Sequence, residues 1–398
     1  MIPGTAVSDD PTPGSQLDGW AGRLLLLLAA VLVTGGAGEV AVRWILGDQM
    51  VLYPRYHSQA VYGAYTLRRL RPNTVFWHTS RDGHWRFVTN AAGFRNDRDV
   101  PYAKPPGRLR VLSLGDSNTE GFEVRQSSTF SAVIEQWLNL HGAPADVLNA
   151  GVSGFGTAEA LAFLENEGIN YHPDVVVYGL YANDFDDNVR SGLFALDHDS
   201  LAVTSTVYAP AAKLLDVLNA IAPLRWLSEH SYLYSLAFNT GWTWFKRADI
   251  HRVRNDSLNE YTQPQGTPNQ DERSLMAALL SRMSQFCRTR GILFVVIDIP
   301  DYVDHDAGAF TTSIPPSLLE DARRDADVLL SSHDVLDPYA GIAKIHVEHG
   351  QHHISEFSHL MLGLRAAQAI LAKRGACGAA PVRLQLCVGR SPAMATAP

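Results

Sequence analysis

The sequence predicts an α/β fold in which helices cover both faces of a parallel sheet of about five strands. Strand-like and helix-like segments alternate five times from Arg108 to the region of Gly375. The segment DVVVYGLY at 174–181 is apolar almost throughout, as strands covered on both faces are. This alternation implies right-handed crossovers between parallel strands. Hydrophobic residues make up 46% of the 398 positions, enough for the large core that such a fold requires.

Five strands and five helices account for the alternation. The predicted strands are LRVLSL at 109–114, DVLNA at 146–150, DVVVYGLY at 174–181, ILFVVIDIP at 292–300 and DVLD at 334–337. The predicted helices begin after Ser127 or Ser128, at Thr157, at Asp271, at Ser317 and after Ser355. The helix that begins at Ser317 is expected to run to Leu330, and the last helix to Gly375.

An apolar segment near the N-terminus predicts an association with a membrane. Residues 1–19 are polar and rich in Pro and Gly, and we expect them to be disordered. Within 20–47, fifteen uncharged residues run from Leu24 to Gly38 and span roughly 22 Å as a helix. The apolar pattern resumes after Glu39 and Arg43, which can pair four residues apart. A single membrane anchor is favoured over a cleaved signal peptide or a buried helix, and the flanking charges do not set its orientation.

Three further segments flank or interrupt the α/β domain at 108–375. Residues 48–107 alternate aromatic and β-branched residues with turns, which predicts a small β-rich appendage around Trp77, Trp85 and Phe87. Residues 186–270 form an insertion with one or two apolar, aromatic helices, interpreted as a lid, a membrane-facing cap or an extra helical layer. Residues 376–398 form a C-terminal tail.

Charge and cysteine content exclude some classes of function. The net charge is −8, and no basic patch suggests nucleic-acid binding. Three cysteines are too few for a disulfide scaffold. Cys287 is expected in the core, whereas Cys377 and Cys387 have a spacing that permits a disulfide in an oxidising compartment. We expect no cofactor.

Polar residues follow the predicted strands at the edge of the sheet where parallel sheets bind ligands. Gly115, Asp116 and Ser117 follow the first strand, and NAGVSGFGT at 149–157 follows the second. Asn183 and Asp184 follow the third strand, and HVEHGQHHIS at 346–355 leads into the last helix. A hydroxyl, a glycine-rich turn, an amide and histidines on one rim are the groups that acyl transfer requires.

These segments resemble the four blocks of the SGNH, or GDSL, hydrolase superfamily, in order, over about residues 108–373. GDSN at 115–118 matches the first block and implies that Ser117 is the nucleophile. NAGVSG at 149–154 implies that the amide of Gly154 joins that of Ser117 in an oxyanion hole. AND at 182–184 implies Asn183 as a side-chain donor to the oxyanion. The resemblance implies a flavodoxin-like three-layer sheet and a serine esterase.

The fourth block leaves two candidates for the general base. His353 lies in the loop just before the Ser355 cap and is favoured. His359, with Glu356 three residues earlier, is the alternative base, but it falls a turn inside the predicted helix. Gly350 stands where the family has its orienting Asp. The residues that we consider for orienting or supporting the imidazole instead are Glu348, Asp337 and His349.

Two other kinds of site fit the sequence less well. The α/β-hydrolase elbow requires a glycine two residues after the serine, where this chain has Thr119. The histidine cluster 346, 349, 352 and 353 suggests zinc only weakly, because no cysteine or set of acids accompanies it. Asp116 and Asp184 are expected to cap turns and to accept hydrogen bonds from backbone amides.

The sequence therefore predicts a membrane-anchored esterase that acts on a small-molecule or glycan ester, with its catalytic domain outside the cytoplasm. If the apolar segment is cleaved, the protein is secreted. Two alternatives stay open: an O-acyltransferase acting on an envelope glycan, and a catalytically inactive sheet that binds a glycan or a protein.

Overall fold

The parallel sheet predicted from the sequence is confirmed. The computed structural model describes residues 13–47, 50–52, 57–198, 200–208, 217–218, 220–241, 267–303, 308–348 and 353–375. All neighbours in the sheet pair in parallel, in the order β14-β11-β7-β5-β6. These strands are β5 (Leu109–Gly115), β6 (Ala145–Asn149), β7 (Val175–Leu180), β11 (Leu293–Asp298) and β14 (Val328–Leu330). Numbered along the chain, the strands lie in the order 5-4-3-1-2, which is the flavodoxin-like arrangement.

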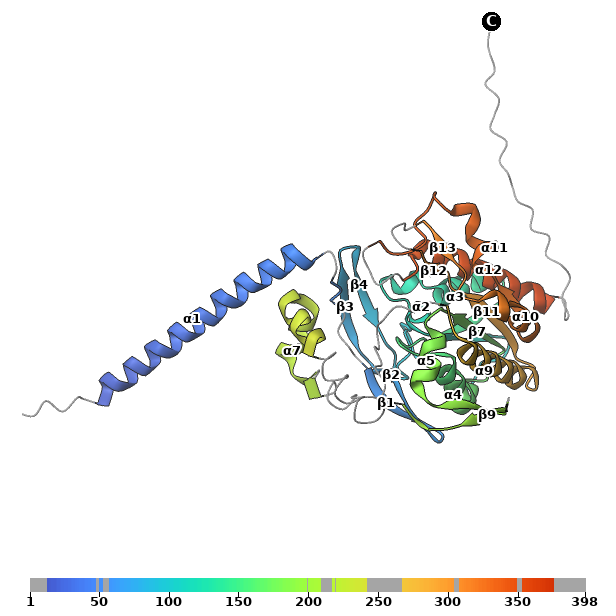
Figure 1. Ribbon diagram of the computed structural model, residues 1–398, viewed down its shortest axis with the longest axis horizontal. Helices are drawn as coiled ribbons and strands as arrows, with labels where there is room; N and C mark the ends of the chain where they lie inside the picture. Colours follow the sequence, from blue (N-terminus) through green and yellow to red (C-terminus); the bar gives the residue numbers. More distant parts are fainter. Residues whose placement is uncertain are drawn as a thin grey trace, which may run out of the picture.

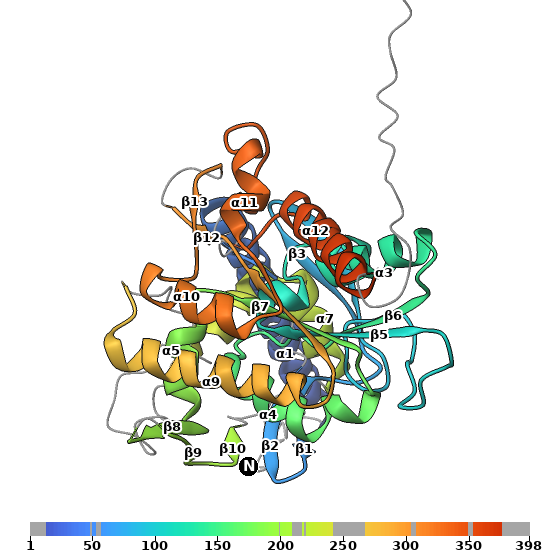
Figure 2. The same ribbon diagram turned by 90° about the vertical axis from the view of Figure 1, so that its right-hand side faces the viewer.

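Helices cover both faces of this sheet (Figure 2). On one face lie α3 (Phe130–Leu140) and α12 (Glu356–Gly375), which pack against each other and bury Val111 and Val177. On the other face lie α4 (Thr157–Asn166), α5 (Asp184–Ser191), α9 (Gln270–Arg288) and α10 (Pro316–Asp325). This second layer covers Leu112 and Val176, the sequence neighbours of the residues buried on the first face. Successive side chains point to opposite faces, so both sets must be apolar.

The fifth strand is not where the sequence predicted it. Helix α10 ends at Asp325, and Val328–Leu330 pairs in parallel with β11 instead of continuing the helix. The predicted strand 334–337 is helical, in α11 (Ser332–Leu336) and the 3₁₀ turn η4 (Asp337–Tyr339). The buried carboxylate of Asp298 accepts hydrogen bonds from the amide and hydroxyl of Ser332, at 3.0 and 2.6 Å. Because that carboxylate comes from β11, the start of α11 depends on a tertiary contact.

The N-terminal helix is longer than predicted. Helix α1 runs over Pro13–Leu46, so residues 13–19 are helical instead of disordered. It projects away from the α/β domain (Figure 1). Its segment Gly19–Leu46 is long and apolar enough to cross a membrane. Residues 1–12 and the tail with Cys377 and Cys387 lie outside the described residues.

The expected β-rich appendage contains two antiparallel hairpins. Strands β1 (His57–Tyr62) and β2 (Tyr65–Leu70) form one, and β3 (Val75–Ser80) and β4 (Gly83–Val88) form the other. Phe87 and Trp85 are buried as expected, but Trp77 is 37% exposed and stacks on His84 instead of joining the core.

The described part of the insertion contains both strands and helices. Strands β8 (Phe194–Asp197) and β9 (Ser200–Val203) form a hairpin, and β10 (Val207–Tyr208) pairs in parallel with β2. Helix α7 (Ala222–His230) and a helical segment at 232–241 follow. Short elements elsewhere complete the fold: α2 (Ser117–Glu120), β12 (Asp301–Tyr302), β13 (Phe310–Thr311) and the 3₁₀ turns η2 (Gln126–Ser128) and η3 (Gly168–Tyr171).

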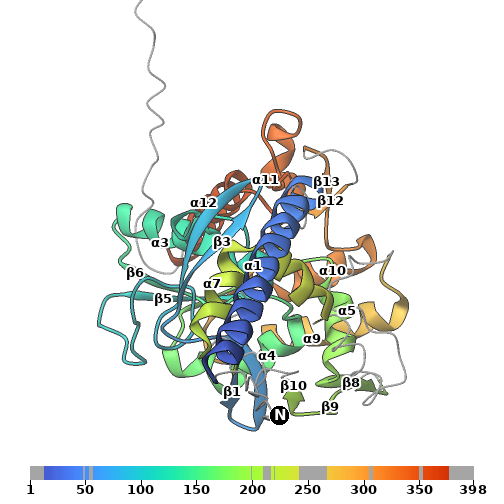
Figure 3. The same ribbon diagram turned by 90° about the vertical axis from the view of Figure 1, so that its left-hand side faces the viewer.

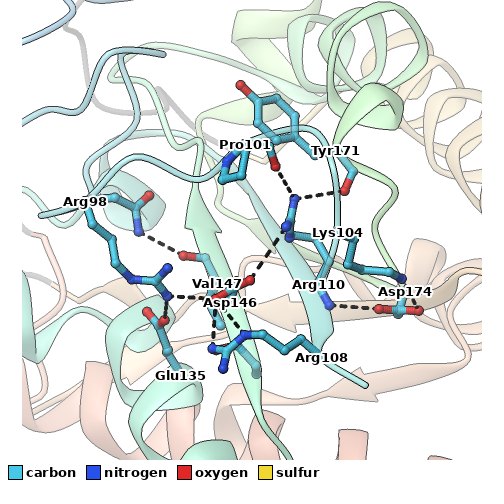
Figure 4. Close-up of polar contacts among 12 residues, drawn as sticks. Arg98, Pro101, Lys104, Arg108, Arg110, Glu135, Asp146, Val147, Tyr171 and Asp174 are labelled. Carbon is cyan, nitrogen blue, oxygen red and sulfur yellow. Dashed lines mark hydrogen bonds and ion pairs between the residues drawn. The ribbon is translucent and has the colours of Figure 1, made fainter. Parts of the chain in front are cut away.

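A buried ionic network fixes the start of the sheet (Figure 4). The side chain of Arg110 on β5 is fully buried and donates to the carbonyls of Pro101 and Tyr171, at 2.9 and 3.2 Å. Asp146 on β6 lies 3.6 Å from the Arg110 guanidinium and accepts hydrogen bonds from Arg98 and Arg108. Burial alone would raise the pKa of Asp146, but the bonds from Arg108 and Arg98 outweigh it and hold the pKa below its ordinary value.

Asp146→Ala is expected to destabilise the folded protein by about 3–5 kcal/mol, because the variant leaves the buried Arg110 cation without its nearest carboxylate. Urea unfolding of the full chain in detergent measures this loss. Glu320→Ala, which breaks an exposed ion pair with Arg323, is the control and should cost less than about 1 kcal/mol. Equal losses in the two variants would contradict the role of the buried network.

Candidate active site

Ser117 is presented by a tight turn at the end of β5. Helix α2 starts at Ser117, and the carboxylate of Asp116 caps it by accepting from the amide of Asn118 at 2.9 Å. Gly115 has a φ of +144°, and a Cβ there would lie 2.3 Å from Thr119 Oγ1 and 2.8 Å from the Gly179 carbonyl. Only glycine fits this position, so the chain can turn directly from the buried strand to the serine.

His353 lies beside the hydroxyl of Ser117. Its Nε2 atom is 2.8 Å from Ser117 Oγ, within the range in which an imidazole can take a proton from a hydroxyl. The main chain around His353 is held in a short antiparallel pairing with 345–347. The Val347 amide donates to the His353 carbonyl, and the Ser355 amide donates to the Ile345 carbonyl, both at 2.9 Å. The histidine is therefore fixed just before α12 begins.

Asn118 joins the turn of the serine to the loop of the histidine. This side chain is 1% exposed, and its Oδ1 accepts a hydrogen bond from the amide of Ile354 at 3.2 Å. Its Nδ2 lies 3.4 Å from Asp116 Oδ2. Since Ile354 directly follows His353, Asn118 ties the loop of His353 to the turn of Ser117. Sequence analysis did not assign this role to Asn118, because the partner amide lies 236 positions away.

The imidazole of His353 rests on Phe122, which in turn contacts a ring of the appendage. The ring centroids of Phe122 and His353 are 4.4 Å apart, and the ring of His78 on β3 lies 4.4 Å from that of Phe122. Burial lowers the pKa of His78 well below its ordinary value, with a smaller contribution from Arg95, so His78 is neutral near pH 7. No sequence pattern indicated that this hairpin would line the site.

The backbone amides of Ser117 and Gly154 are the two that the sequence implied as oxyanion donors. The amide of Ser117 is the first of α2, so it has no partner within that helix. The amide of Gly154 makes no hydrogen bond with any residue that the structure describes. Gly154 has a φ of +77°, and a Cβ there would lie 2.4 Å from Nη2 of Arg68. These amides have the chemistry of donors to a developing oxyanion.

The loop that carries Gly154 is held from two sides. The amide and hydroxyl of Ser153 donate to the Glu120 carboxylate of α2, at 2.6 and 2.7 Å. Arg68 of β2 donates to the carbonyl of the same serine at 2.6 Å. Arg68 bonds the carbonyl of the peptide that contains the Gly154 amide, and Glu120 holds the serine before it, so the orientation of that amide is restricted.

Asn183 lies at the N-terminus of α5, directly after the strand β7. Its Nδ2 donates to Asp187 Oδ2 at 2.9 Å, and Asp187 forms an ion pair with Arg190 at 2.9 Å. An asparagine amide has two N–H donors, and this contact uses one of them. Asp187 therefore fixes the orientation of the amide and leaves its second N–H to point elsewhere.

The two aspartates beside the site act as turn caps. Asp184 accepts hydrogen bonds from the Tyr181 amide at 3.0 Å and from the Tyr178 hydroxyl at 2.7 Å. Burial raises the pKa of Asp116 to about 6, and burial together with Asp116 raises that of Asp184 well above its ordinary value. A charge on Asp116 therefore favours the neutral form of Asp184.

His359 does not reach Ser117. It is fully buried in α12, and its Nδ1 accepts a hydrogen bond at 3.1 Å from the amide of Phe130, the first residue of α3. Its predicted partner Glu356 instead forms an ion pair with Arg125. Among the described residues, Glu356 and His359 therefore do not form the alternative pair. Phe130 occupies the histidine, and Arg125 occupies the glutamate.

The candidate orienting acids have other partners. Glu348 pairs with Lys344, and Asp337 lies 2.9 Å from Nδ1 of His333. His349 lies outside the described residues. His346 Nε2 is 3.0 Å from the carbonyl of Pro300. Within the described ranges, no group of three or more His, Cys, Asp or Glu side chains is arranged to hold a metal ion.

Comparisons with known proteins give structural likenesses only. No family model matches the chain, and none of the curated proteins does. A lipase/acylhydrolase from Enterococcus faecalis is 14% identical, with a TM-score of 0.35 over 67% of this chain and 96% of that one. A putative lipolytic protein of the G-D-S-L family from Desulfitobacterium hafniense is 9% identical, with a TM-score of 0.35 over 66% and 99% of the two chains.

An acetylxylan esterase from Geobacillus stearothermophilus, as a catalytic mutant, is 12% identical, with a TM-score of 0.36 over 69% of this chain and 97% of that one. The descriptions of these structures name lipolytic and esterase proteins, including the GDSL family that the four sequence blocks resemble. Because the TM-scores lie below 0.5, the function has to be inferred from the side chains of the site.

His359 is expected to make stability depend on pH. Burial lowers its pKa to about 3, with smaller contributions from Arg95 and His353. Its ordinary value is about 6.5. Between these two values the unfolded chain binds a proton that the folded site does not. The stability that depends on a neutral His359 is therefore fully present above about pH 6.5, and it is lost as the pH falls toward the pKa of the folded protein.

His359→Gln should remove this dependence. The difference in unfolding free energy between the natural chain and the variant should shrink by up to about 1.4 kcal/mol per pH unit between about pH 6 and 4. Urea unfolding at a series of pH values measures that difference. A difference that stays constant with pH would mean that the folded protein admits the protonated imidazole.

Proposed function

We propose that this protein is a serine ester hydrolase of the SGNH, or GDSL, type, with Ser117 as nucleophile and His353 as general base. The observation that carries the proposal is the 2.8 Å contact between His353 Nε2 and Ser117 Oγ. The amides of Ser117 and Gly154, which make no hydrogen bond with the residues that the structure describes, add donors for an oxyanion. A nucleophile, a base and oxyanion donors are the three parts that acyl transfer through a serine requires.

The first half of the reaction forms an acyl-enzyme. Ser117 Oγ attacks the carbonyl carbon of the ester while His353 Nε2 takes the hydroxyl proton. The carbonyl oxygen becomes an oxyanion, which accepts hydrogen bonds from the amides of Ser117 and Gly154 and from the second N–H of Asn183. When the carbonyl re-forms, the bond to the alcohol oxygen breaks, and the imidazolium gives its proton to the departing alcohol.

The second half releases the acid. Water enters where the alcohol left, and His353 takes one of its protons as its oxygen attacks the acyl carbon. The tetrahedral intermediate is held by the same donors. Its collapse breaks the bond to Ser117 Oγ, which recovers a proton from the imidazolium, and the carboxylic acid leaves.

Packing and backbone contacts take part of the orienting role that an aspartate has in the family. Position 350 is glycine in this chain. The backbone of His353 is paired to Val347, and its ring rests on Phe122. The third member of a serine triad fixes the imidazole and does not itself exchange a proton with the substrate, so such contacts can fulfil part of that role.

Ser117→Ala and His353→Asn should each abolish labelling of the full chain by a fluorophosphonate probe and turnover of p-nitrophenyl acetate. The serine variant lacks the attacking oxygen, and the asparagine variant lacks the base. His359→Gln is the matched histidine control and should retain labelling. Absence of labelling in the well-folded natural chain would favour a binding module instead. Acyl transfer to an added sugar in place of acid release would indicate an acyltransferase.

Asn183→Ala should lower kcat by about 10²–10³-fold with little change in KM, because the lost donor acts mainly on the oxyanion. Steady-state kinetics with p-nitrophenyl acetate measure both constants. Asn170→Ala, which removes an exposed asparagine of η3 before the start of β7, at the opposite end of that strand from Asn183, should leave them unchanged. A proportionate rise in KM with unchanged kcat would show that Asn183 binds the substrate and does not stabilise the oxyanion.

We also propose that α1 anchors the protein in a membrane, with the catalytic domain outside the cytoplasm. The leucines and valines from Leu24 to Val33 are 55–73% exposed where the structure gives values, so they contact little of the described domain. In water this exposed apolar surface would be costly, whereas in a bilayer it is favourable. The side of the membrane follows from the resemblance to exported members of the family.

A further inference from the structure

Glu39 is the one acidic residue in the apolar segment Gly19–Leu46 of α1, and it accepts hydrogen bonds from the insertion. Its carboxylate accepts hydrogen bonds from the Ser231 hydroxyl at 2.7 Å and from the amides of Tyr232 and Leu233 at 2.9 Å each. Tyr232 and Leu233 begin the helical segment 232–241. Glu39 therefore caps the N-terminus of that segment from another helix, where a negative charge is stabilising.

Arg43 holds the other end of the turn at 230–233, between α7 and the segment 232–241. We call this turn the corner. Arg43 donates to Glu39 at 2.7 Å and to the carbonyl of His230, the last residue of α7, at 2.7 Å. A Cβ on Gly38 would lie 3.1 Å from a methyl of Leu233, so the small residue permits close approach. Figures 1 and 3 show α7 beside α1, between α1 and the β3–β4 hairpin.

The length of α1 indicates how deep in a bilayer the corner would lie. A hydrocarbon core of about 30 Å takes about 20 helical residues, at about 1.5 Å each. Counted from Trp20, such a span ends at Glu39. Trp20 and Trp44 are 68% and 87% exposed and lie near the two ends, where tryptophan is enriched at membrane interfaces. Glu39 and the corner bonded to it then lie at the boundary between hydrocarbon and head groups.

The insertion exposes apolar side chains next to that boundary. Val217, Ile221 and Trp226 are 62%, 44% and 59% exposed. We infer that α7 and the segment 232–241 form a second membrane contact, with Trp226 seated in the head-group layer of the bilayer that α1 spans. The occupant of this surface is phospholipid because the surface is continuous with the anchor and bonded to it. The inference rests on the proposed anchoring of α1.

This contact also bears on the catalytic site. Glu229 of α7 accepts a hydrogen bond from the Trp77 amide of β3 at 3.4 Å. The next residue on β3, His78, packs against Phe122, which packs against His353. The insertion thus lies between the anchor and the hairpin that supports the base. A membrane-seated corner holds the catalytic domain at a fixed height and tilt over the bilayer.

Tryptophan quenching by brominated phospholipids tests the inference with the full chain in phosphatidylcholine–phosphatidylglycerol nanodiscs. Bromines placed near the head groups should quench the natural chain, and Trp226→Phe should remove a share of that quenching comparable to the share removed by Trp44→Phe. Trp137→Phe, on helix α3 that covers the sheet, is the control and should remove none.

Each outcome has one meaning. If Trp44→Phe reduces the quenching and Trp226→Phe does not, the anchor stands and the second membrane contact is wrong, with water or a protein covering α7. If neither variant reduces it, α1 is not in the bilayer and both proposals fail. Glu39→Leu, which keeps the anchor apolar but removes the cap, should lower the Trp226 share at least twofold and spare that of Trp44. An unchanged Trp226 share would overturn the role of Glu39.

Discussion

The structure of the site depends on one hydrogen bond between residues 236 positions apart, His353 and Ser117. The two residues meet because β5 ends at the rim of the sheet where the loop before α12 also arrives. Neither end can shift independently, since Asn118 bonds the peptide that follows the histidine. The close packing of Gly115 against Gly179 fixes the serine end by leaving no room for a side chain. The proposed chemistry needs a contact of this length, and the fold supplies it before any substrate binds.

The N-terminal appendage is part of the machinery around this contact. Arg95 is 2% exposed and donates to the carbonyls of Glu120, Gly121 and Val124, which form the turn that follows Ser117. Arg68 holds the loop of Gly154 in the same way. Buried cations bonded to carbonyls are costly to disturb, because an unpaired charge in the interior is strongly destabilising. The appendage and the sheet are therefore expected to fold and function together.

The insertion connects two regions that the chain separates widely. It reaches the anchor through Glu39 and Arg43, and it reaches the β3 strand through Glu229. Charged residues inside an apolar helix are unfavourable unless they find partners, and here the corner at 230–233 supplies them. Glu39 and Arg43, which interrupt the apolar run after Gly38, are the residues through which α1 contacts the insertion.

The sequence by itself determined the three-layer sheet, the positions of its first four strands and the serine of the Ser117–His353 contact, because apolar periodicity and turn chemistry are local properties. It favoured His353 as the base but kept His359 as an alternative. It could not place the fifth strand: Val328–Leu330 is too short to show a period, and Asp298 of another strand caps the helix that was taken for it. Only tertiary structure separated His353 from His359, brought Phe122 and His78 against the base, and gave Glu39 its partners. Each of these depends on residues far apart in the chain, whose approach is set by packing and not by any local pattern.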